Sequence, residues 1–137
     1  MGIEHILVGL DHILFVLTLL LVFVSIGEIS KLATVFTVAH SLTLILAGTG
    51  LLVLSLAFVE PIIALSIACM AIATVFFSSC PIMKRYGVKT SLVFFFGLFH
   101  GLGFVGLLLE LSIPADTFLS SLLVFNVEIE IGQLIII

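Results

Sequence analysis

Five apolar stretches, each close to or above twenty residues, dominate this sequence of 137 residues. An apolar run of about 20 residues is long enough to cross the hydrocarbon core of a bilayer as a helix. The chain is 63% hydrophobic and 9% charged, which is far more apolar surface than a soluble domain of this length can bury. We therefore predict an all-α fold, a polytopic transmembrane helix bundle with lipid as its main solvent.

The predicted spans form a single transmembrane domain over residues 1–137. Short segments that contain charged residues, Gly or Pro separate them, and one of these separators is placed at Glu60 and Pro61. The chain ends on an apolar run without a polar flank, so we expect a longer natural chain, with a sixth span as an alternative. The five predicted spans are about 4–26, 33–55, 61–83, 90–110 and 117–137.

Charge places the connections on two sides of the membrane. All four basic residues fall in the first and third connections, whereas the second and fourth carry only acids. The positive-inside rule then puts the N-terminus outside and the basic connections in the cytoplasm. The net charge of −4 is not clustered, so we expect no nucleic-acid partner. The expected partners are the lipid bilayer and a metal ion, and polar helix faces leave a homo-oligomer open.

Polar side chains at bilayer depth give the strongest functional signal. An ionisable group there costs about 2.5–3.5 kcal/mol on insertion scales, so it tends to face a partner or a wet cavity. The third span has no such group in its interior and is placed at the periphery. We expect the polar faces of the other four spans to converge. Their candidate metal ligands are His5, Asp11, His12, His40, His100 and Glu130, with Thr37, Ser41, Asn126 and Gln133 around them.

Imidazole and carboxylate ligands without thiolates suit a borderline divalent ion such as nickel, cobalt or zinc. His5 and His12 lie about 10 Å apart along a straight helix, whereas the ligands of one ion lie within about 2 Å of it. We therefore predict an outer station at His5 and a deeper one at Asp11 and His12. Two stations along a path favour a permease over a single catalytic centre.

Other interpretations remain open at this point. A membrane histidine can serve only as an interhelical hydrogen bonder, and Ser and Thr commonly bond their own backbone. The glycines between Gly97 and Gly106 favour close helix packing. An intramembrane zinc hydrolase of lipid or amide bonds would use a carboxylate such as Glu130 as general base. A bis-histidine haem protein is a third interpretation, which the acids beside the histidines disfavour.

Four motifs in chain order resemble the HupE/UreJ family. The resemblance implies a small membrane protein of the bacterial inner (cytoplasmic) membrane, linked to nickel supply for hydrogenase and urease. The first motif is also similar to an element of nickel/cobalt permeases. The family usually has glycine where this chain has Glu128. The motifs are His5-x5-Asp11-His12, Ala39-His40-Ser41, Phe99-His100-Gly101-Leu102-Gly103-Phe104 and Phe125-Asn126…Glu130-Ile131-Gly132-Gln133.

The resemblance implies metal-handling roles for His5, Asp11 and His12, with His40, His100 and Glu130 as their counterparts on other helices. The function predicted from residues and resemblance together is a permease for a divalent transition-metal ion, nickel before cobalt or zinc. The ion is then cargo, and the protein is not an enzyme. The zinc-dependent hydrolase is the alternative.

Overall fold

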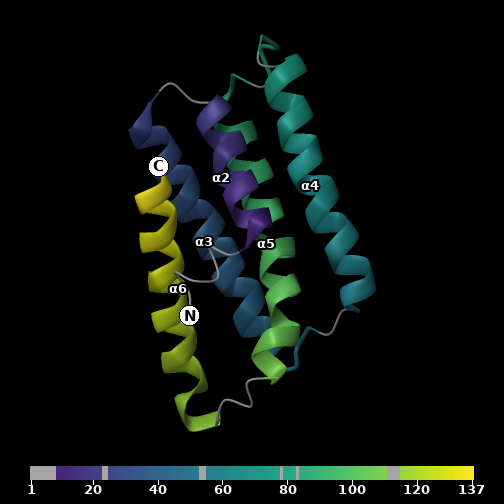
Figure 1. Ribbon diagram of the computed structural model, residues 1–137, viewed down its shortest axis with the longest axis vertical. Coiled ribbons are helices and arrows are strands. Elements are labelled where there is room, and N and C mark those ends of the chain that lie inside the picture. Colours follow the sequence, from purple (N-terminus) through teal and green to yellow (C-terminus); the bar gives the residue numbers. More distant parts are fainter. Residues whose placement is uncertain (1–8, 23–24, 53–54, 78, 83, 111–114) are drawn as a thin grey trace.

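The computed structural model describes residues 9–22, 25–52, 55–77, 79–82, 84–110 and 115–137, and these ranges contain helices but no strand. The long helices run in alternating directions along the bundle (Figure 1), in which α3 packs against α5 and α6, and α4 packs against α5 and α2. The four longest are α3 to α6, each long and apolar enough to cross a membrane. The predicted all-α membrane bundle is therefore confirmed. The helices are α2 (Leu10–Val22), α3 (Ile26–Gly48), α4 (Leu56–Phe77), α5 (Tyr86–Glu110) and α6 (Ala115–Ile136).

The distribution of polarity is the reverse of that in a soluble protein. Large apolar side chains such as Leu65, Phe76 and Phe95 are exposed on the outer surface. Polar side chains are instead enclosed between helices, where His40 is 0% and Gln133 1% exposed. An apolar exterior around a partly polar interior suits a bundle that is surrounded by lipid tails.

Helix α3 begins earlier than the predicted span of 33–55. Ser25 adopts an extended backbone at its N-cap, and Glu28 lies in the first turn, where its charge complements the helix dipole. The helix stops at Gly48 because Gly50 takes a left-handed conformation, with φ at 74°. Residues 25–31, which we expected to form a connection, are therefore mostly the first turns of α3.

Helix α4 also begins before its predicted start. The carbonyl of Ser55 accepts hydrogen bonds from the N–H groups of Phe58 and Val59, so the helix is already formed ahead of Pro61. Proline lacks an N–H, but the loss is tolerated close to a helix N-terminus. The predicted separation at Glu60 and Pro61 is wrong, and Glu60 belongs to the second turn of α4. Helices α5 and α6 start and end close to the predicted limits.

Helix α2 is much shorter than the span predicted over 4–26. Its 13 residues are about 20 Å long, against a hydrocarbon core of roughly 30 Å. The carbonyl of Gly9 accepts hydrogen bonds from His12 and Ile13 at its first turn. This end of α2 lies part-way along the bundle rather than at its surface (Figure 1). His5 lies outside the described residues.

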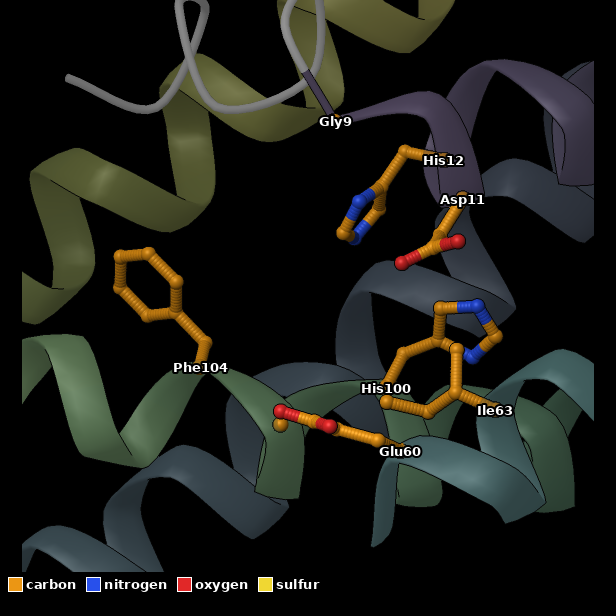
Figure 2. Close-up of a pocket in the computed structure, with 8 residues that line it drawn as sticks. Gly9, Asp11, His12, Glu60, Ile63, His100 and Phe104 are labelled. Carbon is orange, nitrogen blue, oxygen red and sulfur yellow. The ribbon is translucent and has the colours of Figure 1, made fainter. Parts of the chain in front are cut away.

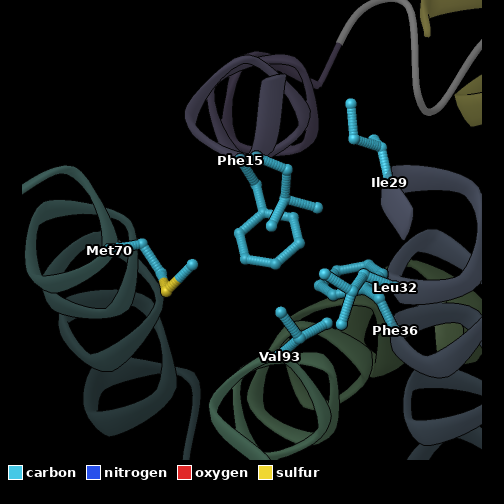
Figure 3. Close-up of a cluster of buried hydrophobic side chains, with 7 residues drawn as sticks. Phe15, Ile29, Leu32, Phe36, Met70 and Val93 are labelled. Carbon is cyan, nitrogen blue, oxygen red and sulfur yellow. The ribbon is translucent and has the colours of Figure 1, made fainter. Parts of the chain in front are cut away.

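Apolar packing fixes α2 against the longer helices. Phe15 of α2 is fully buried, and its ring centre lies 4.6 Å from that of Phe36 on α3. These two rings are part of a buried cluster with side chains from four helices (Figure 3). The cluster holds α2 in place although α2 is too short to cross the membrane. Its members are Phe15, Leu19, Ile29, Leu32, Phe36, Met70 and Val93.

Two glycines allow the backbones of α3 and α5 to touch. A Cβ atom on Gly97 would lie 2.7 Å from the carbonyl oxygen of Phe36, and one on Gly101 would lie 2.5 Å from that of His40. Small residues spaced four apart are a common device for such close helix contact in membranes. The expectation that these glycines serve packing is confirmed, and α5 continues through them without a break.

Candidate metal site

Three of the predicted histidines meet inside the bundle. His12 comes from α2, His40 from α3 and His100 from α5. The ring centre of His12 lies 5.9 Å from that of His40 and 5.5 Å from that of His100. Their exposed fractions are 5%, 0% and 3%. The ring of Phe36 lies within 6.1 Å of all three and closes the group on one side.

His100 has a defined orientation and a defined tautomer. Its Nδ1 lies 2.9 Å from the carbonyl oxygen of Phe96. A carbonyl only accepts, so Nδ1 carries the proton and the Nε2 of the neutral ring keeps its lone pair. Nε2 is buried and has no hydrogen-bond partner among the described residues. A backbone-anchored imidazole with an available nitrogen is the usual state of a histidine that ligates metal.

A pocket of about 500 Å³ opens beside these imidazoles. In Figure 2 the carboxylate of Asp11 points into the space next to His12 and His100, and that of Glu60 extends toward the Phe104 side of the same pocket. Both acids are exposed, whereas both histidines are buried. The lining residues are Gly9, Asp11, His12, Glu60, Ile63, His100, Gly103 and Phe104.

The pocket is suited to a cation. Its described lining contains two carboxylic acids and two imidazoles but no lysine or arginine. Two imidazoles bound to one ion at about 2.0–2.1 Å have ring centres roughly 5 Å apart, which is close to the spacing of His12 and His100. No group of three or more His, Cys, Asp or Glu within the described ranges is arranged to hold an ion as it stands. Binding therefore requires movement of at least one of these side chains.

The sequence profile of the family described as HupE / UreJ protein matches residues 1–137, which is the whole chain. The chain belongs to the HupE/UreJ family. The family is of the nickel/cobalt transporter type, so membership supports a metal permease in the general sense and a multi-pass membrane protein. Neither the curated proteins nor the solved structures contain a significant match to it.

The remaining predicted site residues of this HupE/UreJ protein lie at a seam between α3 and α6. Thr34 donates a hydrogen bond of 2.5 Å to Glu130, and Thr37 donates one of 3.1 Å to Gln133. Glu130 is not among the described residues that line the pocket. The structure therefore brings the three imidazoles and Asp11 together but places Glu130 apart from Asp11, His12 and His100.

Two further residues predicted to surround the ligands have partners within their own helices. Ser41 donates to the carbonyl of Thr37 at 2.6 Å, and Asn126 donates through Nδ2 to the carbonyl of Leu122 at 2.9 Å. The Oδ1 of Asn126 and the Oε2 of Glu130 are buried acceptors without a hydrogen-bond donor in the described part of the chain. The seam between α3 and α6 is thus polar, and two of its buried acceptors lack a hydrogen-bond donor within the described ranges.

The third predicted span, α4, is the least buried of the four long helices, as expected for a peripheral position, but its N-terminal part contributes to the pocket. Glu60 and Ile63 of α4 line the pocket of the HupE/UreJ protein. Sequence reasoning missed Glu60 because Pro61 was interpreted as the boundary of the span. A carboxylate in an otherwise apolar run from Leu56 to Ile63 was the signal that identifies it, since an acid at this depth requires a wet or polar surrounding.

Proposed function

We propose that this HupE/UreJ protein is a permease for a divalent transition-metal ion, nickel before cobalt or zinc, in the bacterial inner membrane. The observation that carries the proposal is the state of His100. Its Nδ1 is anchored by the carbonyl of Phe96, its Nε2 is buried without a hydrogen-bond partner among the described residues, and the residue lines a pocket that Asp11 and His12 also line. Nitrogen and oxygen ligands of this kind favour borderline divalent ions.

Polar groups continue beyond the pocket, which supports passage rather than a closed reaction centre. His40 follows His12 at 5.9 Å between ring centres, and the Thr37–Gln133 and Thr34–Glu130 pairs come next along α3 toward its N-terminus. A hydrolase needs one site with an open position for water. A permease needs successive polar sites between the two sides of the membrane, and this row of side chains has that form.

The charge of the helix ends supports import. Lys31, Lys84, Arg85 and Lys89 lie near the ends of the bundle formed by the α2–α3 and α4–α5 connections, whereas Glu60 lies near the opposite end of α4 (Figure 1). The positive-inside rule assigns the basic end to the cytoplasm. The pocket then opens toward the outside, and the α3–α6 seam lies on the cytoplasmic side of it.

Uptake of radioactive nickel by bacterial cells that lack their own nickel importer tests the proposal. We expect wild-type protein to restore uptake, and Asp11→Ala and His12→Ala to abolish it at equal amounts of protein in the membrane. Glu28→Gln is the control, because Glu28 is also an exposed acid in a first helical turn but is not among the described residues that line the pocket. Wild-type uptake by both alanine variants would overturn the proposal.

The hydrolase is the second candidate because three imidazoles lie close together, as in a zinc site. A purified protein loaded with zinc and incubated with fluorescent lipid and amide substrates distinguishes the two functions. The permease proposal expects no turnover. Turnover that stops when zinc is removed by a chelator would establish the hydrolase instead.

A further inference from the structure

Glu60 occupies a position that an acid rarely takes without a role. It lies in the second turn of α4, between the apolar neighbours Val59 and Ile63, both of which are buried. These two neighbours pack in a cluster with Ala47 and Leu102, so the backbone around Glu60 is fixed from two other helices. The carboxylate itself is exposed and lines the pocket.

The carboxylate faces groups from two other helices across the pocket. Asp11 of α2 supplies a second acid, and His100 of α5 supplies the buried Nε2 that has no hydrogen-bond partner among the described residues (Figure 2). Exposed oxygens thus lie on the open side and an available nitrogen lies in the interior. A divalent cation that enters from solution meets the oxygens before it meets the nitrogen.

The two ligand types suit two stages of binding. Carboxylates attract hydrated cations over several ångströms and accept almost any divalent ion, whereas imidazole selects nickel, cobalt and zinc over magnesium and calcium. A negatively charged pocket mouth also raises the local concentration of the cation and its rate of association. The arrangement therefore separates capture, at the acids, from selection, at His100 and His12.

We propose that Glu60 is the capture ligand of the permease, the acid that first binds the incoming divalent cation and sets the concentration at which the pocket fills. The inference rests on the proposed function. On this inference α4 contributes a ligand to the pocket as well as lining it. Replacement of Glu60 should then change KM for the ion rather than the maximal rate.

Initial rates of nickel uptake, measured over a range of nickel chloride concentrations, test this role. For Glu60→Gln we expect KM to rise about tenfold or more, as for other groups that support a bound metal, with a maximal rate close to wild type. Glu60→Asp keeps the charge and should give an intermediate KM. Glu28→Gln is the matched control for loss of one acid and should leave KM unchanged.

The outcomes separate this inference from the function on which it rests. If wild-type protein gives no nickel uptake, the permease proposal fails. If wild type transports but Glu60→Gln has the same KM, only the capture role is overturned. A lower maximal rate at unchanged KM also overturns it. If Glu60→Gln does not reach the membrane, Glu60→Asp decides. The capture role expects a KM above that of wild type in Glu60→Asp, and a wild-type KM in that variant would overturn it.

Discussion

The imidazole ring of His100 stands edge-on to that of His12, with the ring centres 5.5 Å apart and the planes inclined by 70°. The bond from Nδ1 to the Phe96 carbonyl fixes His100. A shared ion would therefore bind at the Nε2 of His100 with His12 as the neighbouring imidazole. Two imidazoles that ligate one haem iron bind opposite faces of the macrocycle, so the macrocycle lies between them. The rings of His100 and His12 instead contact each other directly.

Removal of His100 should abolish tight metal binding. We expect His100→Ala to weaken cobalt(II) binding by about 100-fold or more. Loss of a residue that only hydrogen-bonds to a metal ligand already lowers metal affinity by about 10–100-fold, and here the ligand itself is lost. The visible absorption of cobalt(II) in the purified protein reports both affinity and coordination. The apparent Tm of the variant provides the control for folding, and a folded variant with wild-type cobalt affinity would contradict the assignment.

Replacement of Gly101 by alanine should destabilise the bundle. The new Cβ would lie 2.5 Å from the His40 carbonyl oxygen and 3.1 Å from the Cβ of Thr43, and neither can move without a shift of α3. Overpacking of this kind costs about 1–3 kcal/mol. Thermal unfolding in detergent, followed by far-ultraviolet circular dichroism, measures the loss as a lower Tm.

Gly103→Ala is the matched control for that change. Its Cβ would lie 2.6 Å from the Cδ1 of Ile63, which is the end of a flexible side chain. A helical alanine also gains roughly 0.5–1 kcal/mol over glycine. We expect a much smaller change in Tm than for Gly101→Ala. Equal losses in the two variants would show that contact between the α3 and α5 backbones is not the cause.

Thr37→Val should weaken the seam between α3 and α6. Thr37 and Thr74 are both 8% exposed and both bond a carbonyl of their own helix, but only Thr37 also reaches another helix, at Gln133. Interhelical hydrogen bonds in membranes are worth about 0.6–1.7 kcal/mol. Unfolding by sodium dodecyl sulfate should show this loss for Thr37→Val and less for Thr74→Val. A larger loss for Thr74→Val would contradict the assignment.

Metal binding should weaken in acid. Histidine ligates metal as the neutral imidazole, so an imidazole ligand that has become protonated in acid must lose that proton when the ion binds. At pH values where both His12 and His100 are imidazolium ions in the free protein, two protons are released when the ion binds. The apparent affinity for nickel should then fall by up to about 100-fold for each unit by which the pH is lowered. Calorimetric titration with nickel chloride at several pH values measures this slope. An affinity that is constant from pH 7.5 to 5 would contradict competition between protons and the metal ion at these two imidazoles.

The sequence was sufficient to predict the four long helices of the described ranges and which of their faces are polar, whereas the first of the five predicted spans corresponds to the shorter α2. The apolar runs identify the long helices, and their 3.6-residue periodicity places His40 and His100 on interior faces. The start of α3 was missed because Gly27, Glu28 and Lys31 were interpreted as a connection, although charged residues also occur in the first turns of a membrane helix.

The order of the helices around the bundle was beyond the sequence. Periodicity shows that Glu130 lies on a polar face, but it does not show which helix that face meets. The contact between α3 and α5 is decided by Gly97 and Gly101, which admit the backbone of α3. Helix α6 packs against another side of α3, where Glu130 accepts a hydrogen bond from Thr34. The two-station path that begins at His5 stays a prediction.

The glycine contact has a consequence for how the ion can pass. His40 and His100 project from two backbones that touch at Gly97 and Gly101, so these imidazoles must travel together as one rigid body. Asp11 and Glu60 belong to α2 and α4, which are held to that pair mainly by side chains. Alternating access would therefore arise from movement of α2 and α4, which carry Asp11, His12 and Glu60, against the α3–α5 pair, which carries His40 and His100.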